Sequence, residues 1–133
     1  MFDAGGRTVV HLIEPQHLFV PALIDVFTEA GLFVDYVGAE LDPRRLLDDQ
    51  PDLIFIDTDF LNEPLEGVRL AHVLAPRAQI YVYSSATTDA ISRAFTSAGA
   101  DVVMEKSADR RSIVQGLREV DRRRRQRQGH THE

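Results

Sequence analysis

Short apolar runs alternate with amphipathic stretches along the chain. Runs with the residue types of buried or half-buried strands lie at 7–13, 32–37, 53–56, 79–84 and 101–105. Between and after them, apolar residues recur at helical spacing at 18–30, 42–48, 65–74, 88–98 and 109–124. Successive strand–helix units with short connections predict an α/β fold, a doubly wound five-stranded parallel sheet with helices on both faces.

The run Leu53–Ile56 is the centre of this pattern. It is unbroken and apolar and is followed by Asp57, as expected of a central parallel strand buried on both faces. The run at 32–37 alternates more and favours an edge position. Gly31 and Asp42 supply a helix end and a helix cap. This arrangement fits the flavodoxin-like strand order 2-1-3-4-5.

Composition limits the kind of protein. At 133 residues with 44% hydrophobic residues, the chain predicts one globular domain at 7–120, preceded by a short extension at 1–6. There is no cysteine, which fits a reducing compartment. No apolar run approaches the length of a membrane span or resembles a signal peptide. We therefore expect a soluble, cytoplasmic protein without a membrane partner.

The net charge of −6 is distributed unevenly. Residues 118–133 hold six arginines and three acids, whereas the rest of the chain holds nine basic and eighteen acidic side chains. An acidic body argues against general nucleic-acid binding, which needs clustered Lys and Arg. The basic end can contact an acidic partner or RNA. We expect residues 121–133 to form a basic tail that is a frayed helix end or disordered.

Polar side chains follow four of the predicted strands. In the order 2-1-3-4-5 Glu14 closes the first strand and faces Asp57 across the crevice where ligands bind. Two close carboxylates repel unless a cation such as Mg²⁺ lies between them. The fourth strand brings Ser84 and Ser85 to this edge, and the fifth brings Lys106, the only lysine beside fourteen arginines. Such a set suits a carboxylate that attacks a phosphoryl donor.

Other interpretations of single residues stay open at this point. Asp57 can also cap the turn that follows its strand, since Asp commonly opens turns. Ser85 can equally be a strand-end cap. His11, in the middle of the first strand, is more typical of a hydrogen-bonded core histidine than of a metal ligand.

Three motifs carry a resemblance to a known family: PDLIFID (51–57), SSA (84–86) and AGADVVMEK (98–106). Over residues 7–120 the chain resembles the receiver domain of bacterial two-component response regulators, including the chemotaxis receiver. The resemblance implies that Asp57 accepts phosphate from a histidine kinase or phosphotransfer protein. It also implies that Ser85 turns toward the phosphoryl group, that Lys106 pairs with its oxygens, and that the only activity is self-phosphorylation and self-dephosphorylation.

The chain departs from the receiver pattern at its acidic pocket. Pro15 stands where receivers carry a second acid that binds magnesium directly, so we expect weak Mg²⁺ binding. The predicted metal ligands are Glu14, Asp57 and Asp59, where Asp59 either replaces the missing acid or is solvated. Val103 stands where receivers have an aromatic residue that moves with the hydroxyl.

Two functions follow from these residues, and a third is disfavoured. The first is a stand-alone receiver that is phosphorylated on Asp57 and docks to a downstream protein target. The second is a pseudo-receiver that works without phosphorylation as an interaction or dimerisation module, for example as a homodimer through its last helices. A flavin or nucleotide enzyme would need a Ser/Thr/Gly-rich phosphate loop after the first strand, and residues 14–17 offer none.

Overall fold

The computed structural model describes residues 6–59 and 61–131, so nearly all of the predicted extension at 1–6 lies outside the described part. Within it, one parallel sheet has the order β2-β1-β3-β4-β5, which confirms the predicted fold class and strand order. The strands are β1 (Val9–Ile13), β2 (Phe33–Gly38), β3 (Leu53–Asp57), β4 (Gln79–Ser84) and β5 (Val102–Glu105).

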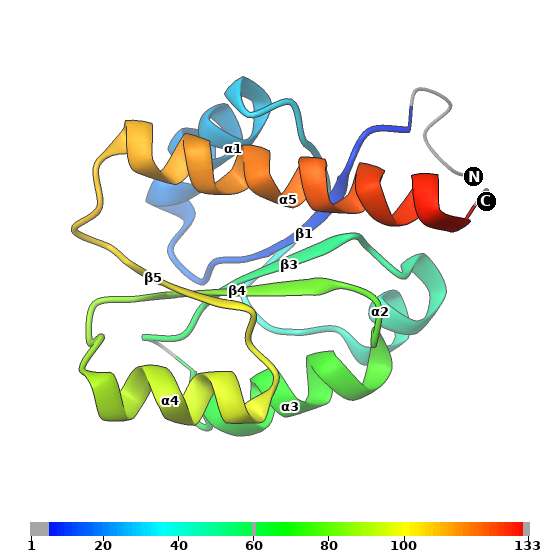
Figure 1. Cartoon of the computed structure of the whole chain (residues 1–133). Coiled ribbons are helices and arrows are strands. Elements are labelled where there is room, and N and C mark those ends of the chain that lie inside the picture. Colours follow the sequence, from blue (N-terminus) through cyan, green and yellow to red (C-terminus); the bar gives the residue numbers. More distant parts are fainter. Residues whose placement is uncertain (1–5, 60, 132–133) are drawn as a thin grey trace.

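Helices cover both faces of the sheet (Figure 1). They are the short 3-10 helix η1 (His17–Phe19), α1 (Val20–Glu29), α2 (Pro43–Asp49), α3 (Pro64–Leu74), α4 (Asp89–Ala98) and α5 (Arg110–Thr131). Helices α1 and α5 lie on one face, and α2, α3 and α4 lie on the other. None of the helices in the described part is long and apolar enough to span a membrane.

The sheet separates two apolar cores, because alternate residues of a strand point to opposite faces. On β3, Phe55 packs with Phe27 and Leu117 beneath α1 and α5. Its neighbour Ile56 packs with Val68 on the α2–α4 side. All five residues of β3 are buried, as predicted for the central strand, whereas β2 is an edge strand with alternating exposure.

Local signals set the helix ends. The Asp42 side chain accepts the N–H of Arg45 at the start of α2, as predicted. Gly31 (φ 85°) and Gly99 (φ 125°) follow α1 and α4 in the left-handed region that favours glycine. These short, defined connections place the carboxyl ends of the strands together at one edge.

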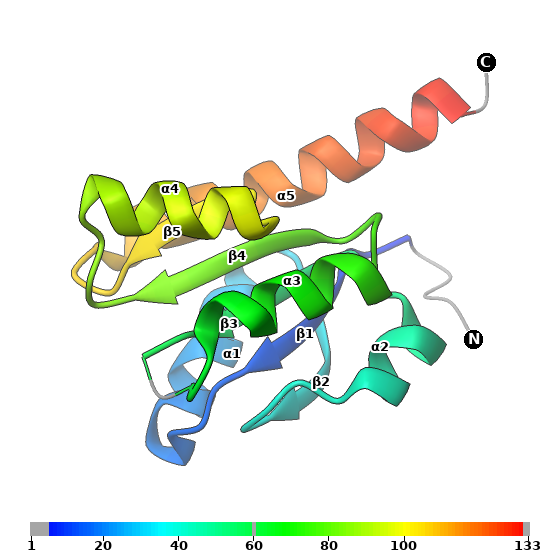
Figure 2. The same ribbon diagram turned by 90° about the horizontal axis from the view of Figure 1, so that it is seen from below.

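Helix α5 is longer than the sequence predicted. Helical spacing predicted an end near residue 124, but the helix continues to Thr131, and only the last two residues lie outside the described part. Fraying of the basic tail at 121–133 stays a prediction. Arg124 is 7% exposed, and its Nε donates to Thr8 Oγ1 at 2.8 Å, while that hydroxyl donates to Asp121 at 2.6 Å. These buried contacts hold α5 on the body, and its last turns run past the sheet (Figure 2).

Candidate functional site

The strand ends bring four polar residues to one edge of the sheet. Asp57 and Ser84 are the last residues of β3 and β4. Glu14 directly follows β1, and its N–H donates to the Gly38 carbonyl at 2.9 Å. Lys106 directly follows β5, and its N–H donates to the Ser84 carbonyl at 3.0 Å. Since all four strands are parallel, these residues lie at the crevice where open α/β sheets bind ligands.

Asp57 is fully buried and uses both carboxylate oxygens. Oδ1 accepts the N–H of Asp59 at 3.0 Å, so the predicted alternative that Asp57 caps the following turn is also confirmed. Oδ2 lies 2.7 Å from Lys106 Nζ. One carboxylate oxygen of Asp57 therefore caps the turn, and the other pairs with a cation at the crevice.

Lys106 bridges two carboxylates. Its Nζ lies 2.8 Å from Asp59 Oδ2 in addition to its contact with Asp57. Burial alone would lower the pKa of Lys106, but hydrogen bonds to both carboxylates outweigh this and raise it. Partial burial would raise the pKa of Asp59, but its bonds with Lys106 and Ser85 lower it. The ammonium and the Asp59 carboxylate are thus both charged near neutral pH.

Glu14 lies beside this ion pair and is shielded from solvent. It is 2% exposed, Oε2 accepts the N–H of Gln16 at 3.1 Å, and Oε1 is buried without a hydrogen-bond partner. Burial raises the pKa of Glu14 to about 7, and the neighbouring Asp57 adds to the rise. Glu14 is therefore partly protonated at neutral pH.

The hydroxyl that lies in the pocket belongs to Ser84, whereas the resemblance to receiver domains assigned this role to Ser85. Ser84 is 3% exposed, and its Oγ donates to Asp59 Oδ1 at 3.3 Å. Ser85 is exposed and contributes its backbone N–H, 3.1 Å from the same oxygen. Successive residues of a strand point to opposite sides, so a difference of one position decides which hydroxyl faces the pocket.

Solved structures resemble this chain along most of its length. A CheY-like receiver domain protein from Methanospirillum hungatei superposes with a TM-score of 0.74 at 16% identity, covering 91% of this chain and 99% of that one. A LuxR-family two-component response regulator from Aurantimonas gives a TM-score of 0.78 at 18% identity, covering 86% and 85%. The chain has the receiver-domain fold. At these identities the likeness establishes the fold alone.

A third solved structure is of a response regulator that carries a modification and ligands. The response regulator from Burkholderia pseudomallei carries a phosphorylated aspartic acid, a calcium ion and citrate. It has a TM-score of 0.67 at 21% identity and covers 83% of this chain and 66% of that one.

Sequence comparison adds a partial match of another kind. No protein-family model matches the chain. Two proteins from Mycobacterium ulcerans and Mycobacterium marinum, provisionally named O-methyltransferases, are each 40% identical over 78 residues. The match covers 53% of this chain and 34% of each relative, so the chain spans about a third of their length.

The pocket offers two carboxylates that could hold a divalent cation. The buried Oε1 of Glu14 has no hydrogen-bond partner and Asp57 is fully buried beside it, so both suit a hard cation with oxygen ligands. Pro15 adds no side-chain ligand. Asp59, the third predicted ligand, lies at the surface with its side chain 18% exposed, in keeping with the solvated alternative, and its carboxylate is turned toward Lys106 and the end of β4. These residues fit a metal that keeps several waters.

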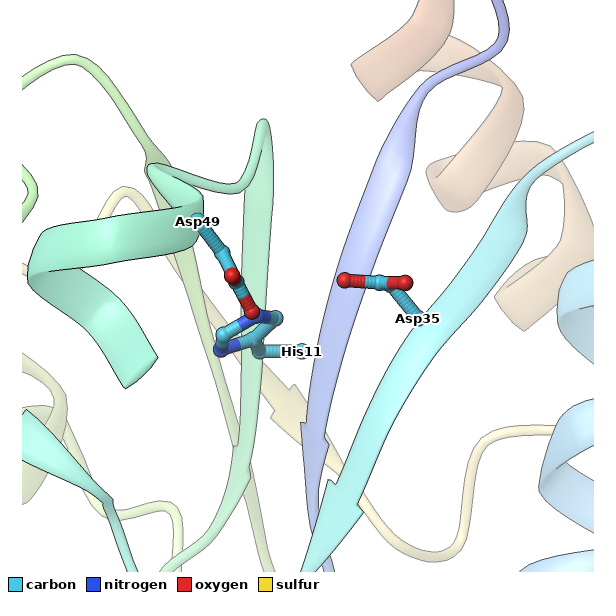
Figure 3. A group of neighbouring side chains, drawn as sticks. All are labelled: His11, Asp35 and Asp49. Atoms are coloured by element: carbon cyan, nitrogen blue, oxygen red, sulfur yellow. The ribbon is translucent and has the colours of Figure 1, made fainter. Parts of the chain in front are cut away.

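A further group of metal-ligand side chains lies between β1, β2 and α2 (Figure 3). His11, 1% exposed, places Nε2 3.0 Å from Asp49 Oδ2, which confirms the predicted hydrogen-bonded core histidine. Burial lowers the pKa of His11, against the influence of Asp49. Arg45 lies 3.0 Å from the same Asp49 oxygen and 3.8 Å from Asp35. A guanidinium thus already balances these acids, and the cluster is explained as structure.

Proposed function

We propose that this chain is a two-component receiver in which Asp57 accepts a phosphoryl group. One observation supports this most strongly: a fully buried carboxylate at the end of the central strand, with an ammonium 2.7 Å from its Oδ2. An ordinary buried aspartate would be costly unless paired, and here the pairing group lies at the open crevice. The fold comparison supports the same function.

The proposed step is a direct phosphoryl transfer. A carboxylate oxygen of Asp57 attacks phosphorus, and the bond from phosphorus to the donor breaks. The leaving group, a histidine imidazole or acetate, departs with the bonding electrons, and Asp57 becomes an acyl phosphate. Lys106 balances charge on the phosphoryl oxygens, and Ser84 offers a hydroxyl to them.

Glu14 and Asp57 would hold magnesium, which would supply neutralisation of charge on the transferring group. The protonated fraction of Glu14 competes with the metal, and Pro15 supplies no oxygen, so weak binding is expected. The physiological donor would be a histidine kinase or phosphotransfer protein. The output would be docking to a protein target, with no enzymatic activity beyond self-phosphorylation and self-dephosphorylation.

The direct test is labelling with acetyl phosphate and Mg²⁺, read by intact mass. We expect the wild type to gain one phosphoryl group only when magnesium is present, and Asp57→Asn to gain none. Asp48→Asn, which removes an exposed acid from α2, serves as the matched control and should label like wild type. An unlabelled wild type at high magnesium would refute phosphoacceptor function.

The second candidate is a pseudo-receiver that binds partners without phosphorylation. It is favoured by the Lys106 bridge, since Asp57 and Asp59 are already balanced by an internal cation. Its expected signature is a wild type that stays unlabelled, with an Asp57→Asn variant that keeps the oligomeric state of wild type.

A further inference from the structure

The carboxylate of Asp59 collects three donors at the end of β4 and β5. Its Oδ2 lies 2.8 Å from Lys106 Nζ. Its Oδ1 accepts the Ser84 hydroxyl at 3.3 Å and the Ser85 N–H at 3.1 Å, and the Ser85 N–H is also 3.3 Å from Oδ2. An ammonium, a hydroxyl and a backbone amide thus converge on one anion, which we call the oxyanion cradle.

The same donors surround the place where a group on Asp57 would lie. Lys106 contacts Asp57 and Asp59 at nearly equal distances, so an anion attached to Asp57 comes within reach of the cradle. A phosphoryl group needs donors of these types for its oxygens. Both Asp59 and a phosphoryl group are anions, so one set of donors cannot fully satisfy both.

We propose that Asp59 is an internal occupant of the oxyanion cradle, a carboxylate that stands in for the phosphoryl group and must be displaced before Asp57 is phosphorylated. The inference rests on the proposed function, because it identifies the group that competes at that site. In the resting protein Asp59 already holds the strand end at Ser84 and Ser85 in the anion-bound arrangement. Asp59 is therefore a positioning residue that slows phosphorylation.

Removal of the Asp59 carboxylate should change the labelling rate in opposite directions for this role and for a metal-ligand role. If Asp59 were a magnesium ligand, its removal would weaken magnesium binding and slow labelling. If it occupies the cradle, its removal leaves Lys106 to Asp57, frees the Ser85 amide and accelerates labelling. The backbone N–H of Asp59 that donates to Asp57 Oδ1 is kept in any side-chain variant. The direction of the rate change separates the two roles.

The first measurement compares acetyl phosphate labelling rates of wild type, Asp59→Ala and Glu63→Ala at equal magnesium. Glu63 is an exposed acid of the same loop, so its variant controls for charge and loop composition. We expect Asp59→Ala to label about tenfold faster, the gain expected from freeing one charge-assisted hydrogen bond. Glu63→Ala should label like wild type. Equal or slower labelling of Asp59→Ala, with wild type labelled, would overturn the inference and leave the phosphoacceptor function intact.

A second measurement works even if no variant is labelled. Sulfate is titrated without metal while the Ser85 amide is followed by ¹H–¹⁵N NMR. We expect the free Ser85 resonance to differ between wild type and Asp59→Ala, and sulfate to shift it only in Asp59→Ala. That result with no labelling anywhere would show that Asp59 occupies the oxyanion cradle, but would refute the phosphoacceptor function and with it the competition with a phosphoryl group. A Ser85 amide unchanged by Asp59→Ala, or unmoved by sulfate in it, would overturn the inference.

Discussion

Glu14 has the most unusual protonation among the residues of the pocket. Its pKa is raised to about 7, first by burial and second by Asp57. Between its ordinary pKa of 4.5 and pH 7 the folded protein holds a proton on Glu14 that the unfolded chain has lost. Stability from this residue is therefore lost as the pH rises through that window, and it stays lost above it.

We predict that Glu14→Gln removes this pH dependence. At pH 5 the variant should match wild type, whereas at pH 8 its unfolding free energy should exceed that of wild type by about 2 kcal/mol. Urea unfolding at the two pH values measures the difference. Glu40→Gln, at an exposed position, should show no such trend. A Glu14→Gln effect that is equal at both pH values would contradict the assigned burial.

The sequence predicted correctly those pocket residues whose position depends only on the order of the strands. Glu14, Asp57 and Lys106 each terminate or follow an apolar run, so order 2-1-3-4-5 brings them together. The choice between Ser84 and Ser85 depends on which side of the strand each side chain faces. The apolar pattern does not determine this side for residues at the end of a strand. The direction of the Asp59 side chain depends on the turn after β3, which sequence periodicity does not determine.

At the scale of elements, α5 is attached by a buried apolar face up to Val120 and, beyond it, by one buried cation. Arg124 is 7% exposed and holds Thr8, whereas Arg125 is exposed and pairs with Asp121 along the helix surface. A hydrogen-bonded group inside the protein contributes more than an exposed ion pair, because its loss leaves a buried partner unsatisfied. Arg124 should therefore contribute much more to the free energy of unfolding than its neighbour Arg125.

We predict that Arg124→Ala lowers the unfolding free energy by about 2 kcal/mol. The matched variant Arg125→Ala should change it by less than about 0.5 kcal/mol. Urea denaturation at neutral pH gives both values. Equal effects of the two substitutions would mean that the end of α5 is not docked on Thr8 in solution.

Element boundaries followed from sequence wherever a local signal existed. The predicted continuous helix at 18–30 is instead η1 followed by α1, because Pro21 in the first turn of α1 lacks an N–H and starts a new helix. The sequence predicted an end of α5 that is too early, because the composition of its last turns obscured a helical signal. Acids at 119 and 121 pair with arginines three and four residues later, and these pairs favour helix where the composition suggested a frayed tail.

The whole molecule is a sheet between two layers of helices, and the burial of its strands decreases from the centre to the edges. Strand β3 is paired on both sides and buried at every residue. Strand β2 pairs only with β1 and alternates between exposed and half-buried residues, and β5, at the other edge, has no fully buried residue. Edge strands with little buried surface open locally at lower free energy than the global unfolding.

Hydrogen exchange under native conditions should reveal this gradient. We predict that the amides of Ile54 and Phe55 exchange only through global unfolding, with a free energy equal to that from urea denaturation. The amides of Phe33 and Tyr36 should exchange through local opening at a clearly lower free energy, because the opening of β2 exposes little apolar surface. Equal protection in β2 and β3 would mean that the edge is covered in solution, as in the association of two copies along β2. Repeating the experiment at several protein concentrations separates these cases, since only association makes the protection of β2 depend on concentration.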